Sequence, residues 1–211
     1  SSASIGGSVY GGGELGVLSG DSVSVSVGRN ESRSESALIE GSVFGGGKGS
    51  ESSSDAGLVS SKVKVEIGAC IVRGSVYGGG ELARTEGAIE VVINGAEINS
   101  NVYGGGLGRA GVQSTNSKRK ITLSYGGVYG SVYGSSSLGD DSGDSEVVLC
   151  GEDPSFVYGS VYGGGFKGIT GGSTSISISG RSLVYHSIYG GGDVGEIGSD
   201  STVFDKVLVT G

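Results

Sequence analysis

The stretch GSVYGGGELG, residues 7–16, decides the fold, because close copies of it recur along the chain. Taken alone, Gly11, Gly13 and Gly16 have the G-x-G-x-x-G spacing of a phosphate-binding loop. A nucleotide site needs such a loop once, opening a helix, and no helical periodicity follows here. The repeated motif is therefore interpreted as a corner of the fold, where the backbone takes unusual φ/ψ angles and neighbouring coils approach closely.

Seven copies of the motif follow one another at intervals of roughly 30 residues, the signature of a repeat architecture. They share the consensus [IV]-x-x-[SN]-[VI]-[YF]-G-[GS]-[GS]. Each copy carries one aromatic residue directly before its glycines, which predicts a single ladder of aromatic rings. These residues are Tyr10, Phe44, Tyr77, Tyr103, Tyr133, Tyr162 and Tyr189.

A second element lies between successive motifs, as in VSVSVG (23–28), VKVEIG (63–68) and TSISISG (174–180). Apolar and polar residues alternate in most of these segments, which is the period of a strand with one buried face. Each segment ends at or near glycine, as expected where the chain turns with positive φ. The sequence therefore predicts an all-β, parallel β-solenoid of about seven coils. Residues 1–211 form one domain in this interpretation, with no evident caps.

Composition narrows the possible partners. The chain contains 47 glycines but one proline, which excludes collagen, and its alternating β-branched segments argue against a disordered linker. A net charge of −8 argues against nucleic acid as a partner, and SKRK (117–120) is the nearest approach to a basic patch. No apolar run is long enough to span a membrane, so membrane insertion is not expected. No cofactor is expected either.

Few residues have the pattern of a chemical site. His186 is the one histidine and lacks a G-x-S-x-G nucleophile, so a turn substitution is favoured over a catalytic base. Cys70 and Cys150 lie three coils apart, which favours small hydrophobic roles over a disulfide. The segment GDDSGDSE (139–146) matches no calcium-loop spacing, which favours a solvated acidic loop over a weak candidate calcium site. Its carboxylates belong to Asp140, Asp141, Asp144 and Glu146.

The SVYGGG coils resemble repeats of large secreted or cell-surface proteins of bacteria, which are adhesin-like β-helices. The resemblance covers the whole chain at the level of repeat and composition. It implies an extracellular or cell-surface location and a structural role that includes adhesion. It names no ligand and no catalytic residue.

Three functional hypotheses follow. The first is a structural, non-enzymatic rod within a surface fibre, stalk or adhesin. The second is a carbohydrate-binding module that uses the tyrosine ladder as a stacking platform for glycans. The third is a polysaccharide-active enzyme, which the absence of a repeated acidic or basic column disfavours.

The ends of the chain carry one further expectation. The sequence begins within one repeat and ends after an alternating strand, so subunits are expected to stack head to tail or to belong to a longer array. Ile5 and Val9 of one subunit would then complete the coil formed by Val207 and Val209 of its neighbour.

Overall fold

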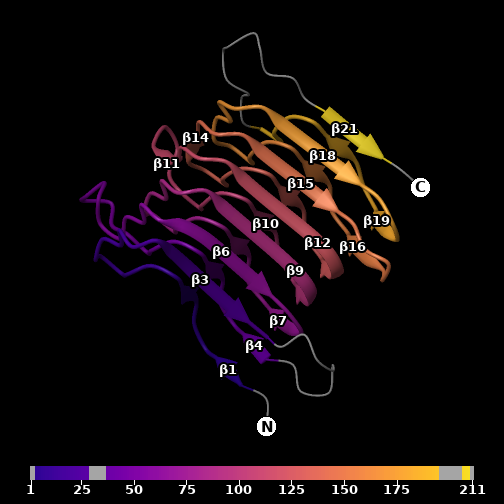
Figure 1. The fold of residues 1–211 in the computed structure, drawn as a ribbon, viewed down its shortest axis with the longest axis horizontal. Coiled ribbons are helices and arrows are strands. Elements are labelled where there is room, and N and C mark those ends of the chain that lie inside the picture. Colours follow the sequence, from indigo (N-terminus) through magenta and orange to yellow (C-terminus); the bar gives the residue numbers. More distant parts are fainter. Residues whose placement is uncertain (1–2, 29–36, 195–205, 210–211) are drawn as a thin grey trace.

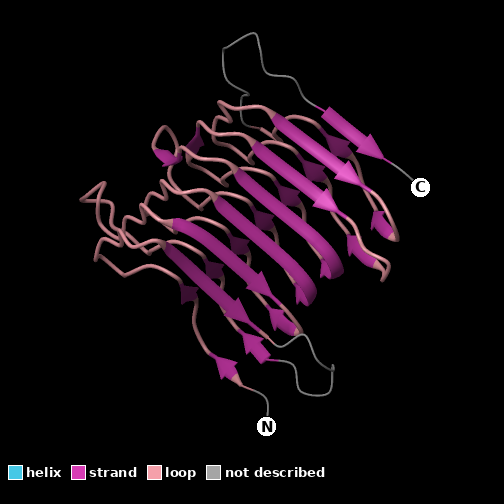
Figure 2. Cartoon of the chain, in the orientation of Figure 1, coloured by secondary structure: helices cyan, strands magenta, loops and turns pink. Residues whose placement is uncertain are grey.

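The computed structural model describes residues 3–28, 37–194 and 206–209, which form a parallel β-solenoid. Figure 2 shows strands joined by loops, with no helix in these residues. The expected fold class is confirmed. The described residues complete about five turns of roughly 29 residues, where seven coils were expected. All seven motifs nevertheless take their places in one sheet, so the coils are numbered 1 to 7 below by their motifs.

A 12-stranded sheet forms one broad side of the solenoid. In Figure 1 its long strands lie side by side in chain order, and β1 and β21 lie at opposite ends of the stack. The long strands are β3 (Ser22–Val27), β6 (Lys62–Ile67), β9 (Ile89–Ile98), β12 (Arg119–Val128), β15 (Ser145–Leu149), β18 (Thr174–Ile178) and β21 (Lys206–Val209). The short strands are β1 (Ser4–Ile5), β4 (Ala37–Ile39), β7 (Cys70–Val72), β16 (Ser155–Val157) and β19 (Ser182–Val184). The second halves of β9 and β12 take the place of short strands in their coils.

The repeated motifs form a second, seven-stranded sheet of two-residue strands. These are β2 (Val9–Tyr10), β5 (Val43–Phe44), β8 (Val76–Tyr77), β10 (Val102–Tyr103), β13 (Val132–Tyr133), β17 (Val161–Tyr162) and β20 (Ile188–Tyr189). A third sheet has two strands, β11 (Gln113–Thr115) and β14 (Asp140–Asp141). Both lie in the segments that join a motif to the next long strand. Every named strand pair is parallel and joins neighbouring coils.

The core consists of columns, a column being the residues that occupy one position in successive coils. The alternation in β6 buries Val63, Val65 and Ile67 and leaves Lys62 and Lys64 exposed, as the period of two predicts. The same inward position passes from Val25 to Val65 to Val91 in register. One continuous hydrophobic cluster, extending from Val23 to Ile178, therefore fills the solenoid.

The glycines act in two different ways. Gly28, Gly151 and Gly180 follow long strands and turn the chain with positive φ, as expected, and Gly95 and Gly126 have positive φ within β9 and β12. The glycines of the repeated motif do not lie in that left-handed region, so the expectation of unusual φ/ψ angles at the corner was wrong. Close approach explains them instead. A Cβ on Gly45 would lie well inside van der Waals contact with the carbonyl oxygen of Gly78, the equivalent glycine of the next coil.

Candidate functional site: the Ser-Val-Tyr-Gly corner

Each position of the repeated motif makes its own contact with the next coil. The serine or asparagine before the valine accepts a hydrogen bond from the backbone amide of its equivalent one coil further on. The Ser42 amide donates to Ser8 Oγ (3.0 Å), and the Ser131 amide donates to Asn101 Oδ1 (2.8 Å). The ladder continues without a break to Ser187, whose amide donates to Ser160 Oγ (3.3 Å). The motif requires Ser or Asn because both side chains supply this acceptor.

The seven aromatic rings form one continuous stack. Ring centroids of successive coils lie 4.7 to 5.0 Å apart, and the ring planes stay within 13° of parallel. This spacing matches that of neighbouring strands, about 4.8 Å, so the backbone pairing sets the ring separation. Each inner ring has its two faces against its neighbours, which leaves neither face free for a sugar.

A second column lies over the edges of these rings, and we call it the lid column. Each coil contributes one residue to it, the residue that directly follows the glycine motif. In coils 2 to 7, the backbone amide of this residue donates a hydrogen bond to a backbone carbonyl of the previous coil. The members of the lid column are Glu14, Lys48, Glu81, Leu107, Ser137, Phe166 and Asp193. Leu107 and Phe166 pack against the rings, and Phe44, Tyr77, Tyr103 and Tyr133 are buried. The ring at the end of the ladder, Tyr189, is 47 % exposed.

Lid residues lean back over rings of earlier coils. Tyr10 Oη donates to Glu81 Oε2 at 2.5 Å, and Tyr133 Oη donates to Asp193 Oδ2 at 3.3 Å, each across two coils. Phe166 meets Tyr133 edge to face one coil back, with centroids 5.8 Å apart. The pKa of Tyr10 is raised to about 12. Desolvation is the largest cause, and the hydrogen bond to the Glu81 carboxylate is the second. Burial likewise raises the pKa of Tyr77 to about 12.

A shorter, exposed tyrosine stack was not predicted. Tyr129, Tyr158 and Tyr185 precede the motif in coils 5 to 7, with centroids 5.2 and 4.7 Å apart and exposed fractions of 42 to 57 %. Phe156 meets the edges of Tyr129 and Tyr158. The sequence signal was the tyrosine that follows valine in VYGSVYG, which repeats at one position in three successive coils.

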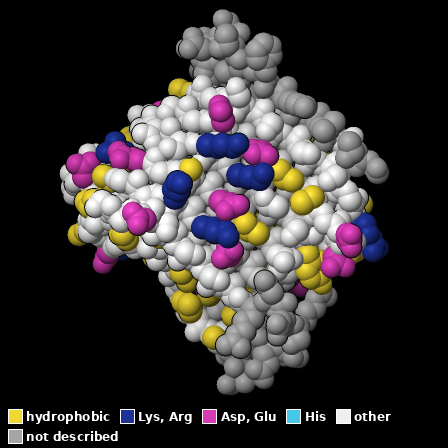
Figure 3. Space-filling view, viewed as in Figure 1, with side chains coloured by type: hydrophobic (Ala, Val, Ile, Leu, Met, Phe, Trp, Pro, Cys, Tyr) yellow, Lys and Arg dark blue, Asp and Glu magenta, His cyan; other side chains and the backbone are white. Residues whose placement is uncertain are grey.

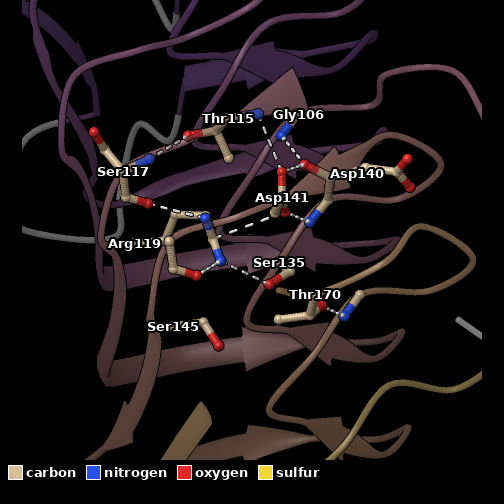
Figure 4. A network of polar contacts seen from close by, with 12 residues as sticks. Gly106, Thr115, Ser117, Arg119, Ser135, Asp140, Asp141, Ser145 and Thr170 are labelled. Atoms are coloured by element: carbon tan, nitrogen blue, oxygen red, sulfur yellow. Dashed lines mark hydrogen bonds and ion pairs between the residues drawn. The ribbon is translucent and has the colours of Figure 1, made fainter. Parts of the chain in front are cut away.

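A buried polar network replaces apolar core residues between coils 4 and 5 (Figure 4). Arg119 stands in the column of Ile89, and its side chain is fully buried beside Asp141, with Nε 3.8 Å from Oδ2. The guanidinium also donates to Ser135 Oγ (3.2 Å) and to the carbonyls of Ser117 and Gly143. Burial lowers the pKa of Arg119, and Asp141 opposes that change.

The Asp141 carboxylate is held from the other side by its own coil and by coil 4. It accepts hydrogen bonds from the Ser136 amide (2.6 Å), Ser136 Oγ (2.8 Å) and the Thr115 amide (3.2 Å). Burial raises the pKa of Asp141, and Arg119 together with these donors lowers it. Ser135 and Ser136 stand where other coils have glycine, so the irregular motif GSSS supplies two partners of the buried pair.

The four carboxylates of the candidate calcium site point to different places. Asp141 faces the core, whereas Glu146 lies on the outer face and pairs with Lys118 (3.3 Å) and Lys120 (3.1 Å). Asp140 and Asp144 accept backbone amides of the next coil, from Ile169 and Ser173. The described residues contain no group of three or more His, Cys, Asp or Glu side chains arranged to hold a metal ion.

The remaining sequence candidates lie apart from one another. His186 is exposed on the turn between β19 and β20. Cys70 is buried and Cys150 half-buried, and both are free thiols. Burial raises the pKa of the Cys70 thiol to about 11. Four residues were expected to join one subunit to the next. Of these, Ile5 is 43 % exposed in β1 and Val9 is half-buried in β2. The other two, Val207 and Val209, pair through their backbones with Ile176 and Ile178.

The outer face of the long strands is a mixed lattice of charge, visible in the middle of Figure 3. Its central column alternates in sign from Lys64 to Glu90 to Lys120 to Glu146. A depression of about 500 Å³ lies on this face, among four lysines and over Ala88. Glu90 also lines the depression, Lys64 pairs with Glu66 at 2.7 Å, and Glu146 pairs with Lys118 and Lys120, so carboxylates offset most of the charge of the four lysines.

No protein-family model, curated protein or solved structure matches the chain. No helix in the described part of the chain is long and apolar enough to cross a membrane.

Proposed function

We propose that the chain is a structural β-solenoid rod that lengthens by end-to-end stacking, within a bacterial surface fibre, stalk or adhesin. The location follows the resemblance of the SVYGGG coils to secreted bacterial β-helices. The structural role is supported by how the motif is used. Its serine, valine, aromatic and glycine positions all make contacts between coils, although Tyr10 and Gly12 of coil 1 also line a pocket with Glu14 and Lys48.

The end-to-end stacking is supported mainly by the positions of the exposed apolar residues. Ile5, Leu15 and Val17 in coil 1 are 43 to 59 % exposed. Five residues at the other end of the stack are also exposed. Among the described residues between Val17 and Tyr129, no large hydrophobic side chain is exposed. These five are Leu183, Tyr185, Tyr189, Val194 and Val209. Tyr129, Tyr158 and Ile169 are exposed in coils 5 and 6, and the other exposed large hydrophobic residues lie at the two ends of the stack. Apolar surface gathered in this way is typical of an interaction site.

Strand edges add a second argument. Among the described strands, β2 and β20 are the outermost of the seven-stranded sheet, so each has one backbone edge with no described strand beside it. A contact between two different ends of one molecule is heterologous and does not close, so it builds filaments.

Sedimentation velocity and negative-stain electron microscopy over a range of protein concentrations test this proposal. We expect rods whose length increases with concentration, and fewer of them for Val9→Asp, which places a charge against the hydrophobic core in coil 1. Ser24→Asp, on the exposed outer face, is the matched control and should assemble as the wild type does. A monomer at every concentration would contradict the proposal.

Carbohydrate binding is the alternative that a glycan array separates from a purely structural role. Among the seven ladder rings, Tyr189 is the most exposed, and its outer face has no described ring against it. Specific glycan binding that Tyr189→Ala abolishes, in protein that does not assemble, would favour the binding module.

A further inference from the structure

Among the described residues, the contacts that join neighbouring coils end at coil 1 and at coil 7. Between every pair of neighbouring coils from 1 to 7, a serine or asparagine accepts an amide, a ring stacks on a ring, and a lid residue donates to the coil before. At coil 7, Ser187 is the last member of the acceptor ladder, and Tyr189 is the last ring. At coil 1, Val9 and Tyr10 are only half-buried, although their equivalents in coils 2 to 5 are buried.

Resting on the proposed end-to-end stacking, we propose that a second copy docks its coil 1 on coil 7 in the same column register that joins coils within the chain. Tyr10 of the second copy then stacks on Tyr189, and Val9 of the second copy packs beside Ile188. The amide of Ser8 of the second copy donates to Ser187 Oγ.

The exposed apolar residues of the two ends match when this register is applied. Val194 follows the lid residue of coil 7, and its amide donates to the Phe166 carbonyl, as the amide of Leu82 donates to that of Lys48. Leu15 holds this same position in coil 1. The register therefore places Leu15 of the second copy, 59 % exposed, on Val194, which is 66 % exposed. We infer that the occupant is a second copy because coil 1 of this same chain supplies a partner in each column. Tyr10 is the partner of Tyr189 in the aromatic ladder, and Leu15 is the partner of Val194 in the position after the lid residue.

The same register brings two carboxylates together. Glu14 and Asp193 are the lid residues of coils 1 and 7, so Glu14 of the second copy lies next to Asp193 at about the 4.8 Å spacing of strands. Like charges in neighbouring strand positions repel, and Lys48, 2.7 Å from Glu14, offsets only part of the charge. We expect Glu14→Gln to strengthen association about threefold at low salt, and less at high salt.

A pair of cysteines tests the register directly. Leu15→Cys with Val194→Cys, in a Cys150→Ser background, places the two thiols at opposite ends of one chain but in neighbouring coils across the junction. Mild oxidation or a short thiol-reactive crosslinker should then give a series of covalent multimers on a non-reducing gel. Leu15→Cys with Leu183→Cys is the matched control. Leu183 is equally exposed on coil 7 but stands in the column of the short strands, so this pair should remain monomeric on the gel.

The outcomes separate the register from the stacking itself. Rods in the microscope without multimers from the Leu15–Val194 pair, or with equal multimers from the control pair, would overturn the register and leave end-to-end association standing. Protein that sediments as a monomer and gives no multimers would overturn both.

Discussion

At the first glycine of each motif, the missing side chain faces the carbonyl of the equivalent glycine one coil further on. The position repeats in six successive contacts, from Gly11 against Gly45 to Gly163 against Gly190. Because the obstacle is backbone, no rotamer change relieves it, and the coils would have to separate. The glycine therefore sets how closely two coils approach.

Gly45→Ala tests this at one residue. Its Cβ would meet the Gly78 carbonyl together with Val63 and Val65, so we expect a loss of roughly 2–3 kcal/mol in the free energy of unfolding, as for other overpacked sites. Gly20→Ala is the control, because nothing lies within 4 Å of its Cβ and the change should stay within about 0.5 kcal/mol. Urea unfolding measures both. Equal losses for the two variants would show that close approach is not what requires glycine.

The buried ion pair makes a second prediction at the residue scale. Asp141→Ala removes the carboxylate that forms an ion pair with a fully buried guanidinium, so we expect a loss of about 3–5 kcal/mol in the free energy of unfolding. Adding Arg119→Ile, the residue type of the neighbouring coil, should recover part of that loss. A double-mutant cycle should give a coupling energy of about 1–3 kcal/mol. Additive effects would mean that the two side chains do not stabilise each other.

Arg119 also shows what sequence reasoning missed. SKRK was considered only as a basic patch, yet Ile121 and Leu123 point inward, and the period of two places Arg119 inward with them. Its partner was less predictable. Asp141 lies in a loop region where coil lengths differ. The pairing of β11 with β14 places it next to Thr115, in the coil that carries Arg119. The serines of GSSS signalled a change in the corner, but not the charge that they bind.

At the scale of elements, the aromatic ladder was predictable in its stacking but not in its burial. Seven aromatics at one position of a parallel repeat must stack at the strand spacing. Whether solvent or protein covers their edges depends on the lid column, whose members are charged, polar or apolar in different coils, as at Glu14, Ser137 and Leu107. Their lean over earlier coils is a property of the folded loops and leaves no sequence pattern.

The ladder should make the protein unstable in alkali. Burial raises the pKa of Tyr77 to about 12 in the folded state, above the usual value of 10.0, so the unfolded chain ionises first. The stability contributed by this phenol is complete below pH 10 and is lost as the pH rises toward 12, by up to about 1.4 kcal/mol per pH unit. Tyr77→Phe should make the fall shallower, because Phe44 shows that the stack accepts phenylalanine. Urea unfolding between pH 9 and 12 measures it, and identical pH profiles would contradict the assignment.

At the scale of the whole molecule, the solenoid is a one-dimensional stack in which each coil mainly contacts its two neighbours. Its stability then depends on which coils are adjacent. Removing a coil should be tolerated where the coils on either side of the cut are alike in every column. It should be costly where one of them depends on the coil that has been removed.

Two deletions distinguish these cases. Deleting residues 70–95 removes coil 3 and joins Ala69 to Ala96, which occupies the register of Cys70, so the core columns continue with apolar residues. Deleting residues 96–125 removes coil 4 and joins Gly95 to Gly126, in the register of Ala96, but takes away Arg119 and leaves Asp141 buried without its cation. We expect the first chain to unfold cooperatively, and the second to be less stable than the first by about 3–5 kcal/mol. Asp141→Thr, which restores the residue type of Thr85 and Thr170 in the coils that flank this position once coil 4 is removed, should recover most of that difference. Equal stability of the two shortened chains in urea unfolding would show that coils 4 and 5 are not joined by the ion pair.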